Sequence, residues 1–280
     1  MKRAFLLLIF IFQISLLFGQ NSFSFVFLPD IHLEPDSAVE VNLDRVIKKI
    51  NKLKPDFLIT GGDMIYTAKN GDDKKAKKLF DLMDEKFTKF KMPIYYTMGN
   101  HEVVGILPNC GIDSSHPQWG KRMYEERYGK RYKSFVNSGW KFFLLDGIKI
   151  REKEMDYTTG VDSMQIEWLK YELLQTDSNM PIVIVIHTPL INPYAIINTQ
   201  YQILSKNAET VLNLFDDYNL KMVLQGHNHK YMNLFFGGIY YLSGGSTLLR
   251  TEPVNEGFLF VKIKNNVEKI KFIQTGGNPH

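Results

Sequence analysis

Apolar residues along this chain form two alternating kinds of stretch, short continuous runs and longer runs with helical spacing. The short runs are rich in Val, Ile, Phe and Tyr and are bounded by Pro, Asp or Gly, which predicts buried strands. They lie at Phe23–Leu28, Asp56–Thr60, Pro93–Thr97, Pro181–Ile186 and Lys221–Gln225. Between them, apolar side chains at three- and four-residue intervals predict helices. These helices cover Leu43–Leu53, about Asp72–Phe90, a stretch through Ile166 and Leu173 that Asp162 or Ser163 caps, and about Ala208–Tyr218.

Three further segments have the pattern of antiparallel strands, Ser134–Asp146, Phe235–Leu242 and Gly257–Gln274. Turns are predicted at Asn137-Ser138-Gly139 and Asn265-Asn266, because Asn and Gly accept left-handed backbone. The order of the elements predicts an α/β fold in which a mixed β-sandwich is flanked by helices. Because no internal repeat or second domain is visible, we expect one domain over residues 21–280.

The N-terminus has a different composition. Two basic residues precede an apolar run from Ala4 to Phe18. This layout is typical of a secretory signal peptide, and the run is short for a membrane span of about 20 residues. We expect residues 1–20 to be removed and the mature protein to be periplasmic or secreted. The alternative is an uncleaved membrane anchor through residues 4–18.

Composition narrows the classes of function further. The chain has 280 residues, of which 44% are hydrophobic and 23% are charged, as is ordinary for a folded globular domain. Its formal net charge of +4 is small, and the clustered Lys74, Lys75, Lys77 and Lys78 lie on a predicted helix, where they form a solvated face. A nuclease would need a basic channel or added domains, and the sequence indicates neither. Because Cys110 is the only cysteine, no intramolecular disulfide can form.

The candidate chemistry lies in short polar segments where histidine recurs beside Asp, Asn and Gly. Each candidate ligand follows the C-terminal end of a predicted strand. The candidates are Asp30, His32, Asp63, Asn100, His187, His227 and His229. Since loops that leave strand ends converge in layered α/β proteins, we expect these side chains to meet. Imidazole and carboxylate together suit Zn, Fe, Mn or Ni, and there are enough ligands for two ions side by side, an arrangement that cleaves phosphate esters.

Taken in order along the chain, Asp-x-His, Gly-Asp, Gly-Asn-His-Glu, an isolated His and Gly-His-x-His resemble the motifs of calcineurin-like metallophosphoesterases. The resemblance spans Phe25 to Tyr231. It implies the four-layer fold of that family and a binuclear metal site. By this resemblance the first ion would be held by Asp30, His32 and His229, the second by Asn100, His187 and His227, and both by a bridging Asp63.

The same resemblance implies the chemistry. Two transition metal ions (Mn, Fe, Zn or Ni) would activate a water as hydroxide, and His101 would be the general acid that protonates the leaving oxygen. Glu102 would orient His101 or support the ligands from behind. Tyr66 completes a Gly-Asp-x-x-Tyr pattern similar to that of purple acid phosphatases, where the tyrosine binds ferric iron. Because those enzymes have glycine where this chain has His32, we expect Tyr66 to support the site or pack beside it. His116 either caps a loop or reaches the substrate pocket.

We therefore expect an exported, metal-dependent phosphoesterase that hydrolyses a small-molecule phosphodiester or phosphomonoester, such as an extracellular nucleotide or a lipid head group. Export argues against a cytoplasmic cyclic nucleotide as substrate. The alternative is a catalytically inactive metal-binding or ligand-binding protein on the same fold. Two stretches, residues 103–133 and 188–205, are predicted to be insertions that shape the substrate pocket. No nucleic acid partner is expected beyond a nucleotide substrate, and a membrane is expected only if the N-terminal segment is retained.

Overall fold

The computed structural model describes residues 22–194, 204–248 and 255–275. The predicted signal peptide and part of the stretch 188–205 lie outside the described residues. Within the described ranges, none of the helices combines the length and the apolar character that crossing a membrane requires.

The first sheet contains five strands in the order β13-β12-β1-β2-β3. Their bounds are β1 Ser22–Leu28, β2 Phe57–Thr60, β3 Ile94–Tyr95, β12 Gly257–Lys264 and β13 Val267–Gln274. The strand β1 pairs parallel to β2 and antiparallel to β12, so the sheet is mixed. The predicted hairpin over Gly257–Gln274 is confirmed as β12 and β13, and both Asn265 and Asn266 have the positive φ of its turn.

The second sheet contains six strands in the order β10-β11-β9-β8-β5-β4. Their bounds are β4 Lys133–Asn137, β5 Trp140–Leu145, β8 Ile182–Ile186, β9 Leu220–Gln225, β10 Tyr231–Phe236 and β11 Ile239–Gly244. The central strands β5, β8 and β9 run parallel. The β8 strand is buried along its whole length, as its continuous run of Ile and Val predicts.

Alternation along β1 explains why the two sheets face each other. Phe25 and Phe27 point into a core between the sheets, whereas Val26 and Leu28 point into a core under the helices. Between the sheets, Phe57 lies 5.4 Å from Phe25 and 5.5 Å from Phe142, measured between ring centroids. The inner faces of both sheets therefore share one aromatic core.

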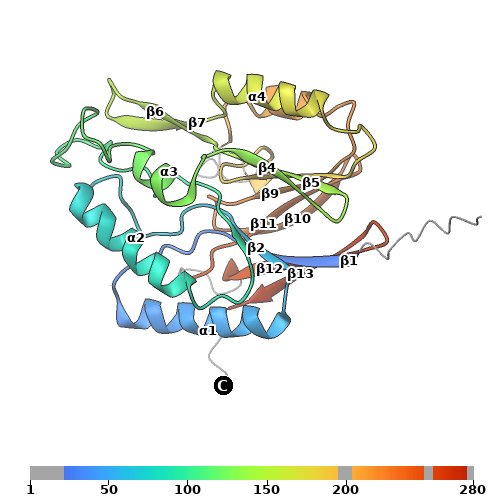
Figure 1. The fold of residues 1–280 in the computed structure, drawn as a ribbon, viewed down its shortest axis with the longest axis horizontal. Helices are drawn as coiled ribbons and strands as arrows, with labels where there is room; N and C mark the ends of the chain where they lie inside the picture. Colours follow the sequence, from blue (N-terminus) through green and yellow to red (C-terminus); the bar gives the residue numbers. More distant parts are fainter. Residues whose placement is uncertain (1–21, 195–203, 249–254, 276–280) are drawn as a thin grey trace, which may run out of the picture.

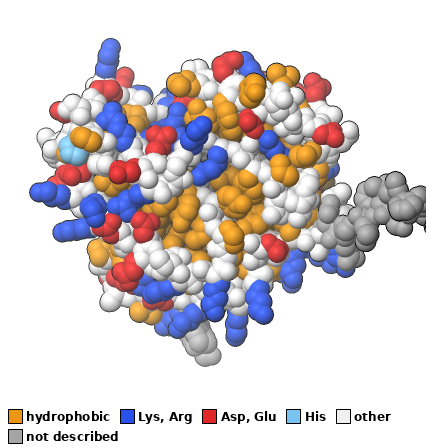
Figure 2. All heavy atoms as spheres, viewed as in Figure 1, with side chains coloured by type: hydrophobic (Ala, Val, Ile, Leu, Met, Phe, Trp, Pro, Cys, Tyr) orange, Lys and Arg blue, Asp and Glu red, His pale blue; other side chains and the backbone are white. Residues whose placement is uncertain are grey.

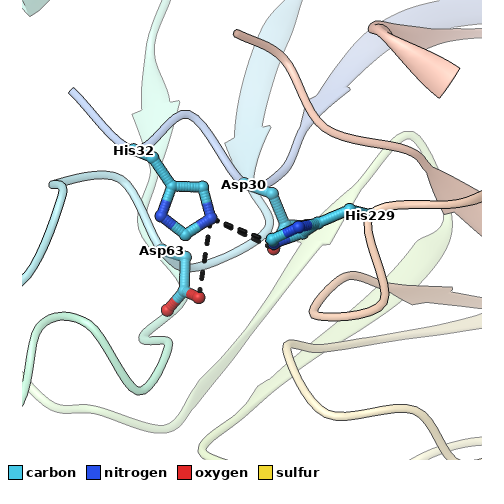
Figure 3. A group of neighbouring side chains, drawn as sticks. All are labelled: Asp30, His32, Asp63 and His229. Carbon is cyan, nitrogen blue, oxygen red and sulfur yellow. Dashed lines mark hydrogen bonds and ion pairs between the residues drawn. The ribbon is translucent and has the colours of Figure 1, made fainter. Parts of the chain in front are cut away.

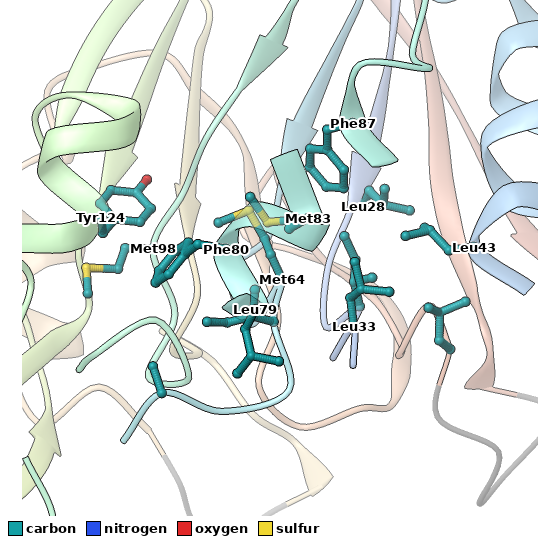
Figure 4. Packing of buried hydrophobic residues seen from close by; sticks show 14 of the residues in the cluster. Leu28, Leu33, Leu43, Met64, Leu79, Phe80, Met83, Phe87, Met98 and Tyr124 are labelled. Carbon is teal, nitrogen blue, oxygen red and sulfur yellow. The ribbon is translucent and has the colours of Figure 1, made fainter. Parts of the chain in front are cut away.

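Helices cover the two outer faces (Figure 1). In the described residues the helices are α1 Ser37–Leu53, α2 Asp73–Phe87, α3 Arg122–Tyr128, α4 Ser163–Leu174 and α6 Ala208–Asn213. Leucine, methionine and aromatic side chains of α1 and α2 fill the core under the first sheet, as the labelled residues in Figure 4 show. Leu169 and Leu173 of α4 pack with Val211 of α6 against the second sheet. The four-layer α/β arrangement, helices, sheet, sheet and helices, is thus confirmed.

Some local elements differ from the sequence-based expectations. The antiparallel pair β6 Ile148–Arg151 and β7 Asp156–Thr159 was not predicted, because its residues alternate too weakly to stand out. Residues 103–133 contain the short helix α3, whose Met123 and Tyr124 are buried in the core under the first sheet. This part of the predicted insertion is therefore integrated into the hydrophobic core. The strand β3 is shorter than the predicted Pro93–Thr97.

Candidate metal centre

The strand ends bring the predicted ligands to one edge of the two sheets. His187 directly follows β8, and His227 follows β9 after a single glycine. Asp30 comes two residues after β1, and Asp63 comes three residues after β2. Since the carboxyl ends of parallel strands point the same way, these four side chains meet although they are distant in sequence.

One group of ligand atoms comes from Asp30, His32, Asp63 and His229, all within 4.8 Å of one another (Figure 3). The Nε2 atoms of His32 and His229 face each other at 3.1 Å. His32 Nε2 lies 4.0 Å from Asp30 Oδ1 and 3.9 Å from Asp63 Oδ2. His229 Nε2 lies 3.4 Å from the same Asp30 oxygen. Two imidazole nitrogens and two carboxylate oxygens thus surround one point.

A second group is formed by Asp63, His187 and His227. His187 Nε2 lies 3.2 Å from Asp63 Oδ2 and 3.1 Å from His227 Nδ1. Asn100 Oδ1 lies 3.1 Å from the same His187 nitrogen, so the amide oxygen joins this group. All seven predicted ligands are therefore brought together, and Asp63 is common to both groups.

The two oxygens of Asp63 have different surroundings. Oδ1 accepts the backbone N–H of His101 at 2.8 Å, whereas Oδ2 faces the imidazoles of both groups. Burial by itself would raise the pKa of Asp63, but the charges of His187 and His101 hold it well below its usual range. The side chain is therefore a carboxylate, with Oδ2 directed at the two groups.

Burial and neighbouring charge also separate the pKa values of the histidines. For His187, burial opposes the charged ring, but the Asp63 carboxylate outweighs burial and raises the pKa to about 9. Burial and the charge of His187 lower the pKa of His227 to about 3. Burial also lowers the pKa of His32, to about 4. The rings of His32 and His227 are thus neutral at pH 7, as metal ligands must be. The His187 ring is protonated on both nitrogens, and a metal would displace one of these protons.

The ligand loops have an unusual backbone. Five of the seven candidate ligands have positive φ: Asp30 at 50°, His32 at 50°, Asp63 at 51°, His227 at 72° and His229 at 53°. Such conformations cost of the order of 1–3 kcal/mol each and persist where the surroundings enforce them. Here the backbone N–H groups of Asp30 and His32 donate to the carbonyls of Gly62 and Asp63, each at 3.0 Å. The N–H of His227 donates to the Asp30 carboxylate at 3.0 Å. Interlocked loops therefore hold the ligands in place.

Glu102 organises the loops from beneath. Its carboxylate is fully buried and accepts the N–H groups of Asp63 at 3.0 Å, Met64 at 2.7 Å, Ile65 at 3.2 Å and Gly99 at 2.8 Å. Burial and the charge of Asp63 raise the pKa of Glu102 to about 7, against the effect of its hydrogen bonds. Glu102 thus joins the Asp63 loop to the Gly99 loop beside the candidate ligands.

His101 lies beside the ligands with its tautomer fixed. Its Nδ1–H donates to the backbone carbonyl of Tyr66, which leaves Nε2 facing the site at 3.7 Å from Asp63 Oδ2. Burial lowers the pKa of His101, and the nearby carboxylate of Asp63 partly opposes this. The His101 side chain is 22% exposed, in contrast to the fully buried side chain of His187.

The two remaining candidates lie in different places. The exposed Tyr66 side chain lines a cavity of about 240 Å³ together with His32, Glu34 and Leu248. His116 belongs to neither ligand group, and its Nε2 lies 4.0 Å from Asp73 at the start of α2. Its Nδ1 accepts the N–H of Gln118 within the same turn. Both roles expected for His116, in capping the loop and in the substrate pocket, stay predictions.

Two backbone carbonyls orient the histidines, and the sequence does not indicate them. The carbonyls of Gly61 and Tyr66 accept the Nδ1–H groups of His187 and His101 and so direct both Nε2 atoms inward. Because any residue has a backbone carbonyl, no residue type in the sequence could have indicated these roles. At Gly99, by contrast, the residue type matters, because a Cβ at this position would lie 2.3 Å from the N and Oδ1 atoms of Asp63.

Comparison with known proteins agrees with this geometry. The family model of calcineurin-like phosphoesterase matches residues 23–231. The chain belongs to this family, whose members are metal-dependent hydrolases of phosphate esters with dinuclear metal centres. No curated protein matches the chain in sequence.

Solved structures show the same fold at low sequence identity. A dimetal phosphatase from Danio rerio has a TM-score of 0.64 and 11% identity, with 91% of this chain and 99% of that chain covered. GAP50, the anchor in the inner membrane complex of Plasmodium, has a TM-score of 0.60 and 16% identity, covering 91% and 85%. The purple acid phosphatase PPD1 of yellow lupin has a TM-score of 0.58 and 16% identity, covering 91% of this chain and 52% of that one.

Proposed function

We propose that this chain is an exported phosphoesterase that holds two transition metal ions and hydrolyses a small-molecule phosphate ester. One observation carries the proposal: Asp63 Oδ2 belongs to both ligand groups, at 3.9 Å from His32 Nε2 and 3.2 Å from His187 Nε2. A shared carboxylate offsets the repulsion between two dications, and two-metal sites of this kind are about 3.5–4 Å wide.

The donor set fits Mn, Fe, Zn or Ni. Imidazole nitrogens and carboxylate or amide oxygens suit borderline transition metals better than Ca or Mg, which take oxygen ligands. His32, Asp30, Asp63 and His229 would hold the first ion, and Asp63, Asn100, His187 and His227 the second. When bound, the ions supply an activated water and Lewis-acid stabilisation of the phosphate oxygens.

The protein supplies the proton for the leaving group. His101 Nε2 points into the site because Nδ1–H is held by the Tyr66 carbonyl. In its protonated form, His101 would transfer the Nε2 proton to the leaving oxygen as the bond to phosphorus breaks. Glu102 accepts the N–H groups of Asp63 and Gly99, and Asp63 in turn accepts the N–H of His101. These hydrogen bonds hold His101 beside the ligands.

A small ester substrate is supported by the size of the cavity and by the mixed charges on one face of the molecule. Figure 2 shows Lys and Arg side chains interspersed with Asp and Glu on the face in view. On this face, that mixture differs from the continuous basic channel with which nucleases track a phosphate backbone. Export is supported by the apolar run after Lys2 and Arg3.

The test is hydrolysis of bis-p-nitrophenyl phosphate and p-nitrophenyl phosphate by the protein loaded separately with Mn, Zn, Fe or Ni. Metal-dependent turnover of either substrate is the expected result, and the ratio of the two rates separates a diesterase from a monoesterase. If the protein binds two equivalents of metal but hydrolyses neither ester, nor any ester of a wider panel, the alternative of a catalytically inactive binding protein is favoured.

A further inference from the structure

Lys69 lies beside His101, the proposed general acid, and forms no ion pair with a carboxylate among the described residues. Its neighbour Ala68 donates its N–H to the backbone carbonyl of His101 at 2.9 Å. The Lys69 carbonyl accepts the N–H of Leu107 at 3.1 Å. The segment that runs from Tyr66 to Lys69 is thus bonded to His101 at both the carbonyl and the ring. This fixes the start of the Lys69 side chain next to His101.

The Lys69 side chain crosses to the hairpin of β6 and β7. Its Nζ atom lies 5.2 Å from the centroid of the Tyr157 ring, on β7. Among the residues that the structure describes, no carboxylate lies within 4.0 Å of this ammonium. Lys69 is only partly exposed, and a cation in such a position gains strongly from an anionic partner.

The charge of Lys69 is felt in the site. Burial lowers the pKa of Lys69, and the charges of Asp63, Glu102 and Asp156 oppose that effect. In return, Lys69 contributes to the lowered pKa of His101, after burial. Tyr157 is also within reach of the Asp63 charge, which adds to the effect of burial in raising its pKa to about 12. Lys69 and Tyr157 therefore flank the site on the His101 side.

We propose that Lys69 and Tyr157 form a subsite for a leaving group that carries its own phosphate. This rests on the proposed function, because His101 marks the side on which the leaving oxygen departs. A phosphate attached through that oxygen would extend toward Lys69 Nζ and supply the missing anion. The preferred substrate class is then a phosphoanhydride, such as a nucleoside diphosphate, ahead of an ester of a neutral alcohol.

The reaction is a hydrolysis without a redox change. A water oxygen forms the new bond to the terminal phosphorus and releases a proton to the medium. The bond between this phosphorus and the bridging oxygen breaks, and its electron pair stays on that oxygen, which takes the His101 proton. The products are inorganic phosphate and a leaving group with one phosphate fewer. Lys69 pairs with the negative charge that remains on the leaving phosphate.

The experiment measures kcat/KM of the full, metal-loaded chain for ADP and for p-nitrophenyl phosphate, whose leaving group has no phosphate. Lys69→Met should lower the ratio of the two constants by about 10–100-fold, the range for a lost charge-assisted hydrogen bond. Lys69→Arg should restore most of the ratio because it keeps the cation. Lys77→Met removes an exposed lysine that pairs with Asp81 on α2, and should leave the ratio unchanged.

Three results would overturn the inference. Wild-type protein that hydrolyses p-nitrophenyl phosphate but not ADP excludes the subsite while the proposed function stands. Equal losses for both substrates in Lys69→Met, with normal thermal unfolding, would mean that Lys69 acts on the reaction in general. An unchanged ratio of the two kcat/KM values in Lys69→Met would mean that the Lys69 ammonium does not contact the leaving group. Failure to hydrolyse any ester with any metal would refute the proposed function itself.

Discussion

Glu102 accepts the backbone N–H of Asp63 at 3.0 Å, so a buried carboxylate below the site holds the loop of the residue shared by both ligand groups. Glu102→Gln should destabilise the Asp63 loop. The amide NH₂ of glutamine would replace one carboxylate oxygen and would face backbone N–H groups that now have no acceptor. A buried donor without an acceptor costs about 1–3 kcal/mol. Urea unfolding should show a free energy of unfolding that is lower by this amount, and metal analysis should show a lower metal content. Glu85→Gln, on the exposed face of α2, should change neither. Unaltered stability of Glu102→Gln would refute this role.

His101→Ala should lower turnover without lowering the metal content. Nε2 lies 3.7 Å from Asp63 Oδ2, and His101 is absent from both ligand groups. The variant is expected to retain two equivalents of metal and to lose about 10²–10⁴-fold in kcat, the range expected if His101 is the general acid. The loss should grow as the pKa of the leaving alcohol rises. Equal losses for good and poor leaving groups would contradict proton transfer by His101.

Gly99→Ala should displace Asp63. The added Cβ would lie 2.3 Å from Asp63 N and Oδ1, atoms that are held by Glu102 and by the N–H of His101. We expect both metal equivalents to be lost and the protein to remain folded. Gly71→Ala is the matched control, because its Cβ would meet the flexible side chain of Lys75. Gly99→Ala protein that keeps its metals would show that the loop can relax.

Metal affinity should depend on pH through His187. Its pKa in the metal-free protein is raised from 6.5 to about 9, so the proton on this ring stabilises the metal-free fold below pH 6.5 and that contribution disappears as pH rises through 9. Metal binds only the neutral ring, so its apparent affinity should rise about tenfold per pH unit below 9 and then level off. Calorimetry in buffers of different ionisation enthalpy should detect about one proton released per ion in this group. Affinity that is constant between pH 6 and 8 would contradict the assignment.

The sequence indicated the candidate ligands more readily than the groups that orient them. Asp30, His32 and His187 were found because their residue types are rare beside buried strands and chemically specific. The carbonyls of Gly61 and Tyr66 were not found, because a backbone oxygen carries no residue signal. The role of Glu102 depended on the fold: only folding brings the Asp63 loop within 3.0 Å of its carboxylate.

Long-range placement also limited what the sequence could indicate about the fold. The strongly apolar β8 and the capped α4 could be predicted from local patterns alone. The weakly patterned β6 and β7 form a hairpin whose Tyr157 meets Lys69 from a distant loop. Such a contact depends on tertiary packing and has no local sequence pattern.

The most direct test of the binuclear site is the electron paramagnetic resonance spectrum of the protein loaded with two equivalents of Mn(II). Because Asp63 Oδ2 is shared by both ligand groups, the two ions should be magnetically coupled, and Asp63→Ala should abolish the coupled signal. A spectrum of isolated Mn(II) in the wild-type protein, at two bound equivalents, would contradict the shared carboxylate and with it the binuclear site.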